Sequence, residues 1–510
     1  MSDSKVDNQP QFGKLRAALW PIHGSELKKF IPLALMMLLI LFIYATLRSL
    51  KDSLVVPTLG AEAIPFLKFF VVLPMAIVFF VIYTKLVNVM KKEHIFYLIV
   101  GFFITFFVFF GFVFYPYRDI FHPDAITVVH WMEILPQNFH GFLLIVKAWS
   151  FSVFYVLAEM WGVLMISLMF WQFANQITRT REAKRFYAFF GIIAQISLIL
   201  SGFMTKTVVT SDYLSRLNED PYLYPLYLTI LGVVVAGMLI GFIYFWMNKY
   251  VLTDPKYYDE AEVADKPKKK KVKLSMKDSL NYLFHSKYLG YIAILVISYG
   301  LTMGLIEVVW KNMLRIQYPS REAYLGFMSD FQMWFGLTSL IAAFSFKGIV
   351  RKFGWLIGAM VTPIMMLVTS VIFFIFIFFK DASALTGSLA YLSATPVFAA
   401  VIIGAIQNIL SKGTKYSLFD PTKEMAYIPL NEELKVKGKA AVDVVGNRFG
   451  KGSSGLIGSG LMIILAGNIA MITPYVAAIV GVFIIAWLFA VRRLNKLYHN
   501  LVHEEADGEA

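Results

Sequence analysis

The sequence lacks cysteine altogether and is poor in charged residues. With no Cys among 510 residues, a disulfide, a thiolate nucleophile and a cysteine-ligated metal site are all excluded. Asp, Glu, Lys and Arg make up only 16% of the chain, against about 25% in an average soluble domain. The eight His are scattered and stand in no nucleophile-elbow or metal-ligand pattern. The sequence therefore predicts no enzyme, no metal site and no cofactor.

Apolar residues are abundant instead. They make up 58% of the chain, and the mean hydropathy is +0.66. A helix needs about 20 consecutive apolar residues to cross a bilayer, and the sequence contains twelve such stretches. They lie at 30–51, 64–88, 94–116, 142–175, 185–208, 223–248, 288–312, 324–347, 354–379, 395–417, 440–467 and 470–492. The stretch 142–175 is too long for one simple span, so we expect it to be tilted or to begin as an interfacial helix.

Polar segments divide the chain into two similar halves. We predict a tail at 1–29, a six-helix bundle at 30–248, a basic linker at 249–287, a second six-helix bundle at 288–497 and an acidic tail at 498–510. Lys and Arg outnumber Asp and Glu by 47 to 33, and most fall on the side that holds both termini, which indicates the cytoplasm. The predicted fold class is an all-α polytopic membrane protein with twelve transmembrane helices in two six-helix halves.

The basic linker and the N-terminal tail indicate in which membrane the protein lies and not which ligand it binds. The run KPKKKKVK at 266–273 is typical of a solvated segment attracted to anionic lipid headgroups, so we expect a lipid bilayer and no nucleic acid as its partner. The tail at 1–29 lacks a cleavable apolar region and a transit-peptide pattern. We therefore expect a bacterial inner membrane rather than a plastid.

Charges inside the first bundle are the first candidate functional residues. A charge within the membrane is costly and normally faces a partner or an aqueous site. Arg48 and Asp52 are four residues apart and can pair, which leaves Lys51 without a local partner. Tyr155 and Glu159 lie on one polar stripe of the fourth span, with no cation three or four residues from the carboxylate.

Further charges follow in both halves. Glu307 precedes Lys311 by four residues, the better order for a helical pair. Lys68 lies within PFLKFF, and Arg448 and Lys451 are three apart with no acid three or four residues from either, which suits an anionic ligand. Each of these charges also has a structural explanation, either an end-of-helix lysine that reaches the headgroups or a salt bridge between helices.

The run GNRFGKGSSG around Lys451 is similar to a phosphate-binding P-loop but does not fit it. Three residues separate Gly446 from Gly450 where the motif needs four, Gly452 stands where Ser or Thr is required, and no strand precedes the run. We reject an ATPase and interpret most of these glycines as positions of close helix packing.

Seven motifs spread along the chain carry a family resemblance. They are LRSLKDSLVV (47–56), PFLKFF (65–70), AEMWG (158–162), FWQFANQIT (170–178), EAKRFY (182–187), IEVVWK (306–311) and KYSLFDPTKEMAYIPLNEELKVKGKAAVDVVG (415–446). Together they closely resemble the ATP/ADP translocases of plastids and obligate intracellular bacteria, over about 12–497. The resemblance implies a twelve-helix exchanger, similar in fold to the major facilitator superfamily, that trades host ATP for bacterial ADP.

The resemblance also implies which residues matter. Two lysines and two glutamates are essential in the family. By motif they correspond to Lys51, Glu159, Glu307 and either Lys423 or Lys415. A polar residue after EAKRFY, usually Asn in the family, is Gln195 here, and the family's KSGG reads KGSSG at Lys451. For an apolar or aromatic slot that holds the adenine, the candidates are Tyr155, Phe173, Asn175 and Tyr416.

The cargo's charge gives the expected mechanism. ATP carries about four negative charges and ADP about three, and fixed cations attract them strongly at low effective dielectric. We expect Lys51, Lys68, Lys451 and Arg448 to face the phosphates between the halves of a monomer, with phosphate as a further candidate for co-transport. Glu159 and Glu307 would hold these cations when the site is empty. The alternative is an exchanger or proton-coupled importer of GTP, UTP, CTP or NAD with the same fold.

Overall fold

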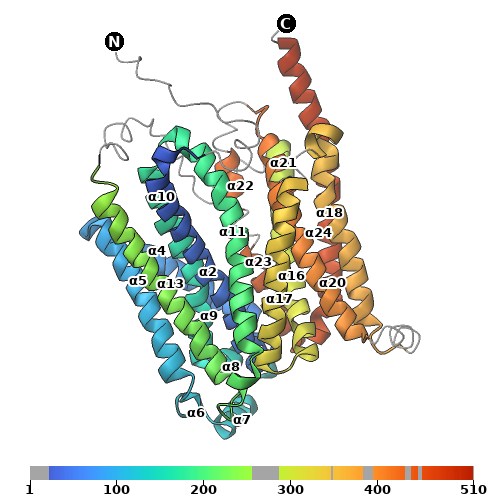
Figure 1. Cartoon of the computed structure of the whole chain (residues 1–510). Coiled ribbons are helices and arrows are strands. Elements are labelled where there is room, and N and C mark those ends of the chain that lie inside the picture. Colours follow the sequence, from blue (N-terminus) through green and yellow to red (C-terminus); the bar gives the residue numbers. More distant parts are fainter. Residues whose placement is uncertain are drawn as a thin grey trace.

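The computed structural model describes residues 22–254, 286–345, 349–382, 394–430, 438–445 and 451–508. Within these ranges every regular element is a helix, which confirms the all-α prediction. The start of α2 (Leu27–Leu59) and the end of α24 (Ile469–Gly508) lie at the same end of the molecule, which we call the terminal end (Figure 1). The opposite end, where α6 (Arg118–Phe121) and α7 (Ala125–Ile134) lie, is called the far end.

The first half, residues 22–254, occupies the left of Figure 1. Besides α2, α6 and α7 it contains η1 (Gly24–Glu26), α3 (Ala63–Phe66), η2 (Leu67–Val72), α4 (Leu73–Val89), α5 (Lys92–Phe109), η3 (Phe110–Phe114), η4 (Gln137–Phe139), α8 (His140–Lys147), α9 (Trp149–Trp161), η5 (Gly162–Phe170), α10 (Trp171–Ile177), α11 (Thr180–Val209), α12 (Asp212–Ser215) and α13 (Leu223–Tyr250).

The second half, residues 286–508, occupies the right. Besides α24 it contains α16 (Lys287–Gln317), α17 (Arg321–Ser345), α18 (Ile349–Phe378), α20 (Pro396–Thr414), η7 (Lys415–Phe419), α21 (Asp420–Met425), α22 (Lys439–Val445) and α23 (Lys451–Leu465).

Ten helices in the described ranges are long and apolar enough to span a membrane. They match ten of the twelve predicted stretches, and the count of twelve is not confirmed. The predicted span at 324–347 falls on α17, which carries Asp330 and Gln332 and packs between α11, α2 and α20. The predicted span at 440–467 falls on α22 and α23, with 446–450 outside the described residues. Both are more polar or shorter than a simple lipid-facing helix.

The stretch at 142–175 is not one continuous span. Ala148, with φ −130° and ψ 62°, separates α8 from α9. The stretch therefore begins as a separate short helix, and α9 then continues through η5 into α10.

Wide π-type turns interrupt several of the long helices. Lys68 lies inside one of them, η2, and Glu159 lies three residues before η5. A third, η7, follows directly on α20. Because π-turns disturb the regular ladder and are frequent at functional sites, these positions are the first places to examine for a ligand.

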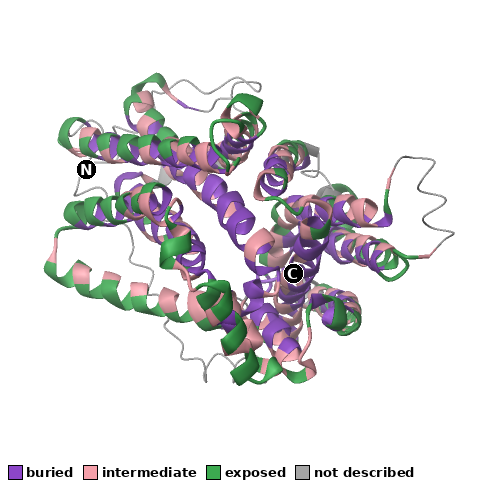
Figure 2. Cartoon of the chain, turned by 90° about the horizontal axis from the view of Figure 1, so that it is seen from below, coloured by how far each residue is buried: buried purple, intermediate pink, exposed green. Residues whose placement is uncertain are grey.

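Each half has its own apolar core. One cluster of buried residues is formed almost entirely by the first half, and the other by the second half with a few residues around the end of α2 and α3. Figure 2 shows buried residues on the sides of the helices that face one another and exposed residues on the outer sides. Large apolar residues such as Phe80 and Phe242 are among the exposed ones. An apolar exterior is what lipid requires.

The two halves meet most closely along α11 and α17. A Cβ on Gly202 would lie 2.7 Å from the Ser329 carbonyl oxygen, and a Cβ on Gly336 would lie 2.8 Å from the Gln195 carbonyl oxygen. Both positions therefore require glycine, since any larger residue would separate the backbones. The close packing brings polar groups into contact: Ser49 donates to Gln332 Oε1 (2.8 Å), whose amide donates to Ser201 (3.2 Å).

Candidate functional site

Seven charged side chains from both halves form one continuous network of ion pairs, which we call the central network. Its members are Arg48, Lys51, Asp52, Lys68, Glu159, Glu307 and Lys311. On α2, α9 and α16 they lie six to eleven residues from the far end of the helix, roughly 9–17 Å along the axis. The sequence placed these charges on separate spans, and the fold brings them together between the halves.

The buried part of the network is centred on Asp52, whose side chain is fully buried. Lys51 donates to Asp52 Oδ1 (3.0 Å), and Lys311 Nζ lies 2.8 Å from Asp52 Oδ2, an ion pair that does not meet hydrogen-bond geometry. Lys51 Nζ also lies 3.0 Å from Glu159 Oε1 and 3.9 Å from the centre of the Tyr155 ring. Asp52 thus joins a lysine of each half.

The accessible part of the network is centred on Glu307. This carboxylate contacts Lys311 (3.1 Å), Arg48 (3.5 Å) and Lys68 (3.7 Å). The side chains of Glu159, Arg48, Lys68 and Glu307 are 29%, 25%, 24% and 19% exposed, whereas those of Lys51 and Lys311 are 4% and 2% exposed. Part of the network is therefore open to solvent although it lies between membrane-spanning helices.

The charges of the central network do not balance. Four cations share three carboxylates, so the network has one excess positive charge. Three of its contacts cross between the halves: Lys311 with Asp52, Arg48 with Glu307 and Lys68 with Glu307. Such a network can accept an anion, because a phosphate oxygen can replace a carboxylate oxygen as the partner of Lys or Arg.

Two expectations about the first span are wrong. Arg48 does not pair with Asp52 but reaches Glu307 in the other half, and Lys51 does not lack a partner. The spacing of four residues allowed the Arg48–Asp52 pair, but Asp52 is taken by Lys51 and Lys311. Lys51 is consequently more deeply buried than Lys68, the other lysine expected to face the phosphates.

The candidates for the base lie on several different elements. The Tyr155 ring is buried under Lys51, and its hydroxyl has no hydrogen-bond partner in the described part of the chain. Phe173 is buried and packs on Tyr244, whereas Tyr416 is 61% exposed. Asn175 is exposed on α10 and accepts a hydrogen bond from Tyr187 (2.6 Å). Among these four residues, Tyr155 contacts the central network, through the Lys51 ammonium group over its ring.

Gln195 lies on α11 at the contact with α17. Its side-chain oxygen is buried and accepts no hydrogen bond from the described residues. A buried amide oxygen without a donor is unusual, so Gln195 remains a candidate for a residue that binds the nucleotide.

Both candidate lysines of the KYSLFDPTKEM motif have an acidic neighbour. Lys415 Nζ donates to Asp420 (2.6 Å) and lies 4.8 Å from the centre of the Tyr416 ring. Lys423 Nζ lies 3.5 Å from Glu424. Lys451 begins α23, but its side chain lies outside the description, as does Arg448 entirely.

The sequence did not single out Lys412, which lies on α20 near the central network. Its ammonium nitrogen is buried. The signal was present, since Lys412 falls within the predicted span 395–417 and no acid lies three or four residues away.

A second polar cluster joins the halves at the far end, and we call it the end cluster: Thr58, Tyr115, Arg118, Asp220 and Arg321. Arg321 donates to Thr58 Oγ1 (3.2 Å) and to the Tyr115 hydroxyl (2.9 Å). Tyr115 in turn donates to Asp220 (2.9 Å), which also pairs with Arg118 (2.9 Å). Burial, opposed by the charge of Arg321, raises the pKa of Tyr115, so the phenol stays protonated and keeps donating to Asp220.

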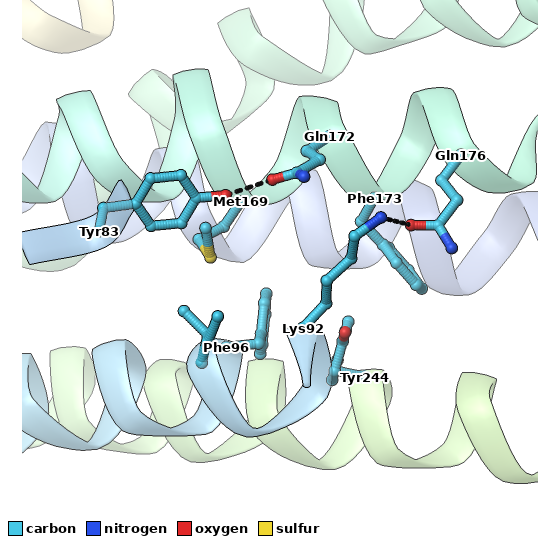
Figure 3. Close-up of a pocket in the computed structure, with 9 residues that line it drawn as sticks. Tyr83, Lys92, Phe96, Met169, Gln172, Phe173, Gln176 and Tyr244 are labelled. Atoms are coloured by element: carbon cyan, nitrogen blue, oxygen red, sulfur yellow. Dashed lines mark hydrogen bonds between the residues drawn. The ribbon is translucent and has the colours of Figure 1, made fainter. Parts of the chain in front are cut away.

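One pocket lies within the first half rather than between the halves (Figure 3). Tyr83 and Lys92 reach across it to Gln172 and Gln176, to which they donate hydrogen bonds, above a floor that includes Phe96. It shares no residue with the central network, and Lys92 is the one charged residue in its lining.

Comparison with known proteins gives consistent results. The family model described as TLC ATP/ADP transporter matches residues 5–498. The chain is 48% identical over 492 residues to ADP,ATP carrier protein 1 of Chlamydia muridarum, covering 96% of this chain and 92% of that protein. It is 47% identical over 513 residues to ADP,ATP carrier protein 1 of Rickettsia conorii, covering 99% of both.

Solved structures show the same fold at low sequence identity. A bacterial homologue of the iron transporter ferroportin, in the inward-facing state, superposes with a TM-score of 0.52 at 14% identity, covering 92% of this chain and 98% of that one. A bacterial metal transporter superposes with a TM-score of 0.51 at 15% identity, covering 91% and 98%. The predicted major-facilitator-like fold is thereby confirmed.

Proposed function

The chain belongs to the TLC ATP/ADP transporter family, and from that premise we propose that it exchanges ATP for ADP across a membrane by alternating access to one central site. It is a multi-pass membrane protein and a transporter rather than an enzyme. The observation that carries the proposal is the central network, an excess of cations held between the halves.

The network suits a polyphosphate for an electrostatic reason. Two opposite charges 4 Å apart attract by about 4 kcal/mol at the effective dielectric of a partly buried site, against about 1 kcal/mol in water. A nucleotide with three or four negative charges would meet Arg48 and Lys68 first, because their side chains are the more exposed cations of the network. Lys51 and Lys311 lie behind them on Asp52.

The carboxylates account for exchange rather than leak. When the halves move apart at the network, the contacts of Lys311 with Asp52 and of Arg48 and Lys68 with Glu307 must break. Buried charges that lose their partners are strongly destabilising, so the empty carrier resists this movement. A bound nucleotide would supply replacement partners, and the loaded carrier would move in either direction.

Topology, location and coupling form part of the proposal. From the excess of positive charge on the side of the termini we propose that both termini lie in the cytoplasm. We propose that the membrane is the inner membrane of an obligate intracellular bacterium. We take the working unit to be a monomer. Exchange of ATP for ADP moves about one net charge, which is worth about 2.3 kcal/mol per 100 mV, unless phosphate moves as well.

Counterflow in proteoliposomes tests the proposal. Vesicles that hold the purified protein and ADP should take up labelled ATP, whereas vesicles without internal nucleotide should take up almost none, because the empty carrier does not reorient. Excess external ADP should compete with the label. Stronger competition by GTP, CTP, UTP or NAD than by ADP would replace ATP/ADP exchange with the alternative cargo, and uptake into empty vesicles would contradict obligatory exchange.

A further inference from the structure

Lys412 is a buried cation with no acidic partner among the described residues. It lies on α20, three residues before the π-turn η7. Its ammonium nitrogen is buried and makes no hydrogen bond with the described part of the chain. Two rings of α17 lie near it, Phe335 at 5.2 Å and Phe331 at 5.8 Å from ring centre to nitrogen.

The charges that act on Lys412 belong to the central network. They are those of Arg48, Glu307, Lys311 and Lys68. Three of these four are cations, and the single acid, Glu307, already contacts all three. Lys412 is thus repelled by the network as it stands, and with Lys412 included the described cluster holds five cations against three carboxylates.

Along the helix axes, Lys412 lies closer to the terminal end of the molecule than the central network does. Glu307 is ten residues from the far end of α16, whereas Lys412 is sixteen residues from the start of α20, which lies at that same end. The difference is about six residues, or roughly 9 Å along a helix. A lysine side chain on α20 therefore reaches the network from the side that faces the termini.

An unpaired ammonium in this position contributes nothing to folding. Burial of a charge without a partner is unfavourable, and contact with aromatic faces offsets only part of that cost. A hydrophobic residue would pack against Phe331 and Phe335 at no electrostatic cost. A bound anion would supply the partner that the ammonium group lacks.

We propose that Lys412 is a phosphate-binding residue of the transport site, which selects cargo by the charge of its phosphate chain. The inference rests on the proposed function and deepens it. In the empty carrier the ammonium group lies against Phe331 and Phe335; with cargo it turns to a phosphate oxygen. The added charge favours nucleoside tri- and diphosphates over the monophosphate, whose shorter chain gives fewer oxygens to the five cations.

The experiment compares nucleotides of different phosphate number on one variant. In proteoliposomes that exchange labelled ADP, the apparent affinities for ATP, ADP and AMP are measured by competition for the wild type, Lys412→Gln, Lys412→Arg and Lys380→Gln. Lys380 pairs with Asp381 away from the network and serves as the control for loss of one lysine. We expect Lys412→Gln to weaken ATP and ADP roughly tenfold, the loss of one charge-assisted hydrogen bond, and AMP much less. Lys412→Arg should restore most of the preference.

A thermal measurement separates a binding role from a structural one. Without nucleotide, Lys412→Met should unfold at the same temperature as the wild type or higher, because it removes an unpaired buried charge. The stabilisation by saturating ATP should shrink. A lower melting temperature without nucleotide together with an unchanged ATP shift overturns the proposal, as does an unchanged ratio of ATP to AMP affinity in Lys412→Gln. Absence of any exchange by the wild type would instead overturn the proposed function itself.

Discussion

The central network and the end cluster both join the two halves, but by different kinds of contact. The central network consists of ion pairs between 2.8 and 3.7 Å, most of which do not meet hydrogen-bond geometry. The end cluster is built on directional hydrogen bonds around one phenol, which accepts from Arg321 and donates to Asp220, both at 2.9 Å. Asp220 of the end cluster also pairs with Arg118 (2.9 Å) and lies 4.0 Å from Arg321. The contacts of Arg321 with Thr58 and Tyr115, however, are hydrogen bonds to neutral groups, which the central network lacks among the described residues.

The difference indicates two roles in one transport cycle. Shared ion pairs can exchange one anionic partner for another, so a nucleotide can enter the central network without leaving a charge unpaired. Matched hydrogen bonds can only form or break, so the end cluster favours the closed arrangement of the far end and must break when that end opens. We therefore expect changes in the central network to alter binding, and changes in the end cluster to alter which end is open.

The largest expected effect comes from removing charge at the buried part of the central network. Lys51→Ala leaves Asp52 and Glu159 without one of their cations, and we expect exchange to fall about a hundredfold or more. Loss of one partner of a buried pair also destabilises by about 3–5 kcal/mol. The double variant Lys51→Met/Glu159→Gln removes both charges and should recover stability, but not exchange.

Melting temperature and counterflow are measured on the same preparations. If the double variant recovers both properties, Lys51 has only a structural role, and the contrast between the two clusters disappears. If Lys51→Ala still exchanges at the rate of the wild type, Lys51 is not part of the site.

The next effect concerns the end cluster. Arg321→Ala removes the hydrogen bonds to Thr58 and Tyr115, and two such bonds contribute on the order of 1–3 kcal/mol, roughly a 5- to 150-fold shift in the population of the open far end. Because the chain has no cysteine, a single Cys at Ser49 is an unambiguous reporter. A membrane-impermeant maleimide added from the far side should label Ser49→Cys faster when Arg321 is replaced.

Nucleotide affinity provides the contrast. Arg321→Ala should leave the ratio of ATP to AMP affinity unchanged, since the end cluster shares no residue with the central network, where we propose that the phosphates bind. A changed ratio with unchanged labelling would reverse the roles assigned to the two clusters.

The fold could be predicted largely from the sequence, because long apolar runs leave few alternatives in a membrane. Ten of the described helices fall on predicted stretches. α17 falls on the predicted stretch 324–347 but carries polar groups that neighbouring helices satisfy: Lys206 of α11 pairs with Asp330, and Ser49 and Ser201 contact Gln332. The break at Ala148 depends on backbone angles that no periodicity reveals.

The site could be predicted in its members and in one pair, Glu307 with Lys311, which the structure confirms at 3.1 Å, but not in its contacts between the halves. Motifs identified Lys51, Glu159 and Glu307, whereas the partners were assigned from spacing along one helix. The actual partners are set by the approach of α16 to α2, which brings Lys311 to Asp52 and Arg48 to Glu307. Local spacing carries no information about a contact between residues more than two hundred positions apart.

The smallest expected effect comes from a single oxygen atom in the end cluster. Tyr115→Phe keeps the buried ring but removes the hydroxyl that bridges Arg321 and Asp220. The expected cost is about 1 kcal/mol, so labelling of Ser49→Cys from the far side should rise about fivefold, less than in Arg321→Ala. The control is Tyr117→Phe. Tyr117 is an exposed neighbour of the cluster, and its replacement should leave the labelling rate unchanged.

Because burial raises the pKa of Tyr115 above the ordinary value of about 10, its proton is retained in alkaline solution. The labelling rate of Ser49→Cys, corrected for the reactivity of a free thiol, should therefore stay constant between about pH 7 and pH 9. A rise over that range that Tyr115→Phe abolishes would mean that the phenol ionises, and that the hydrogen bond from Tyr115 to Asp220 does not hold the far end closed in alkaline solution.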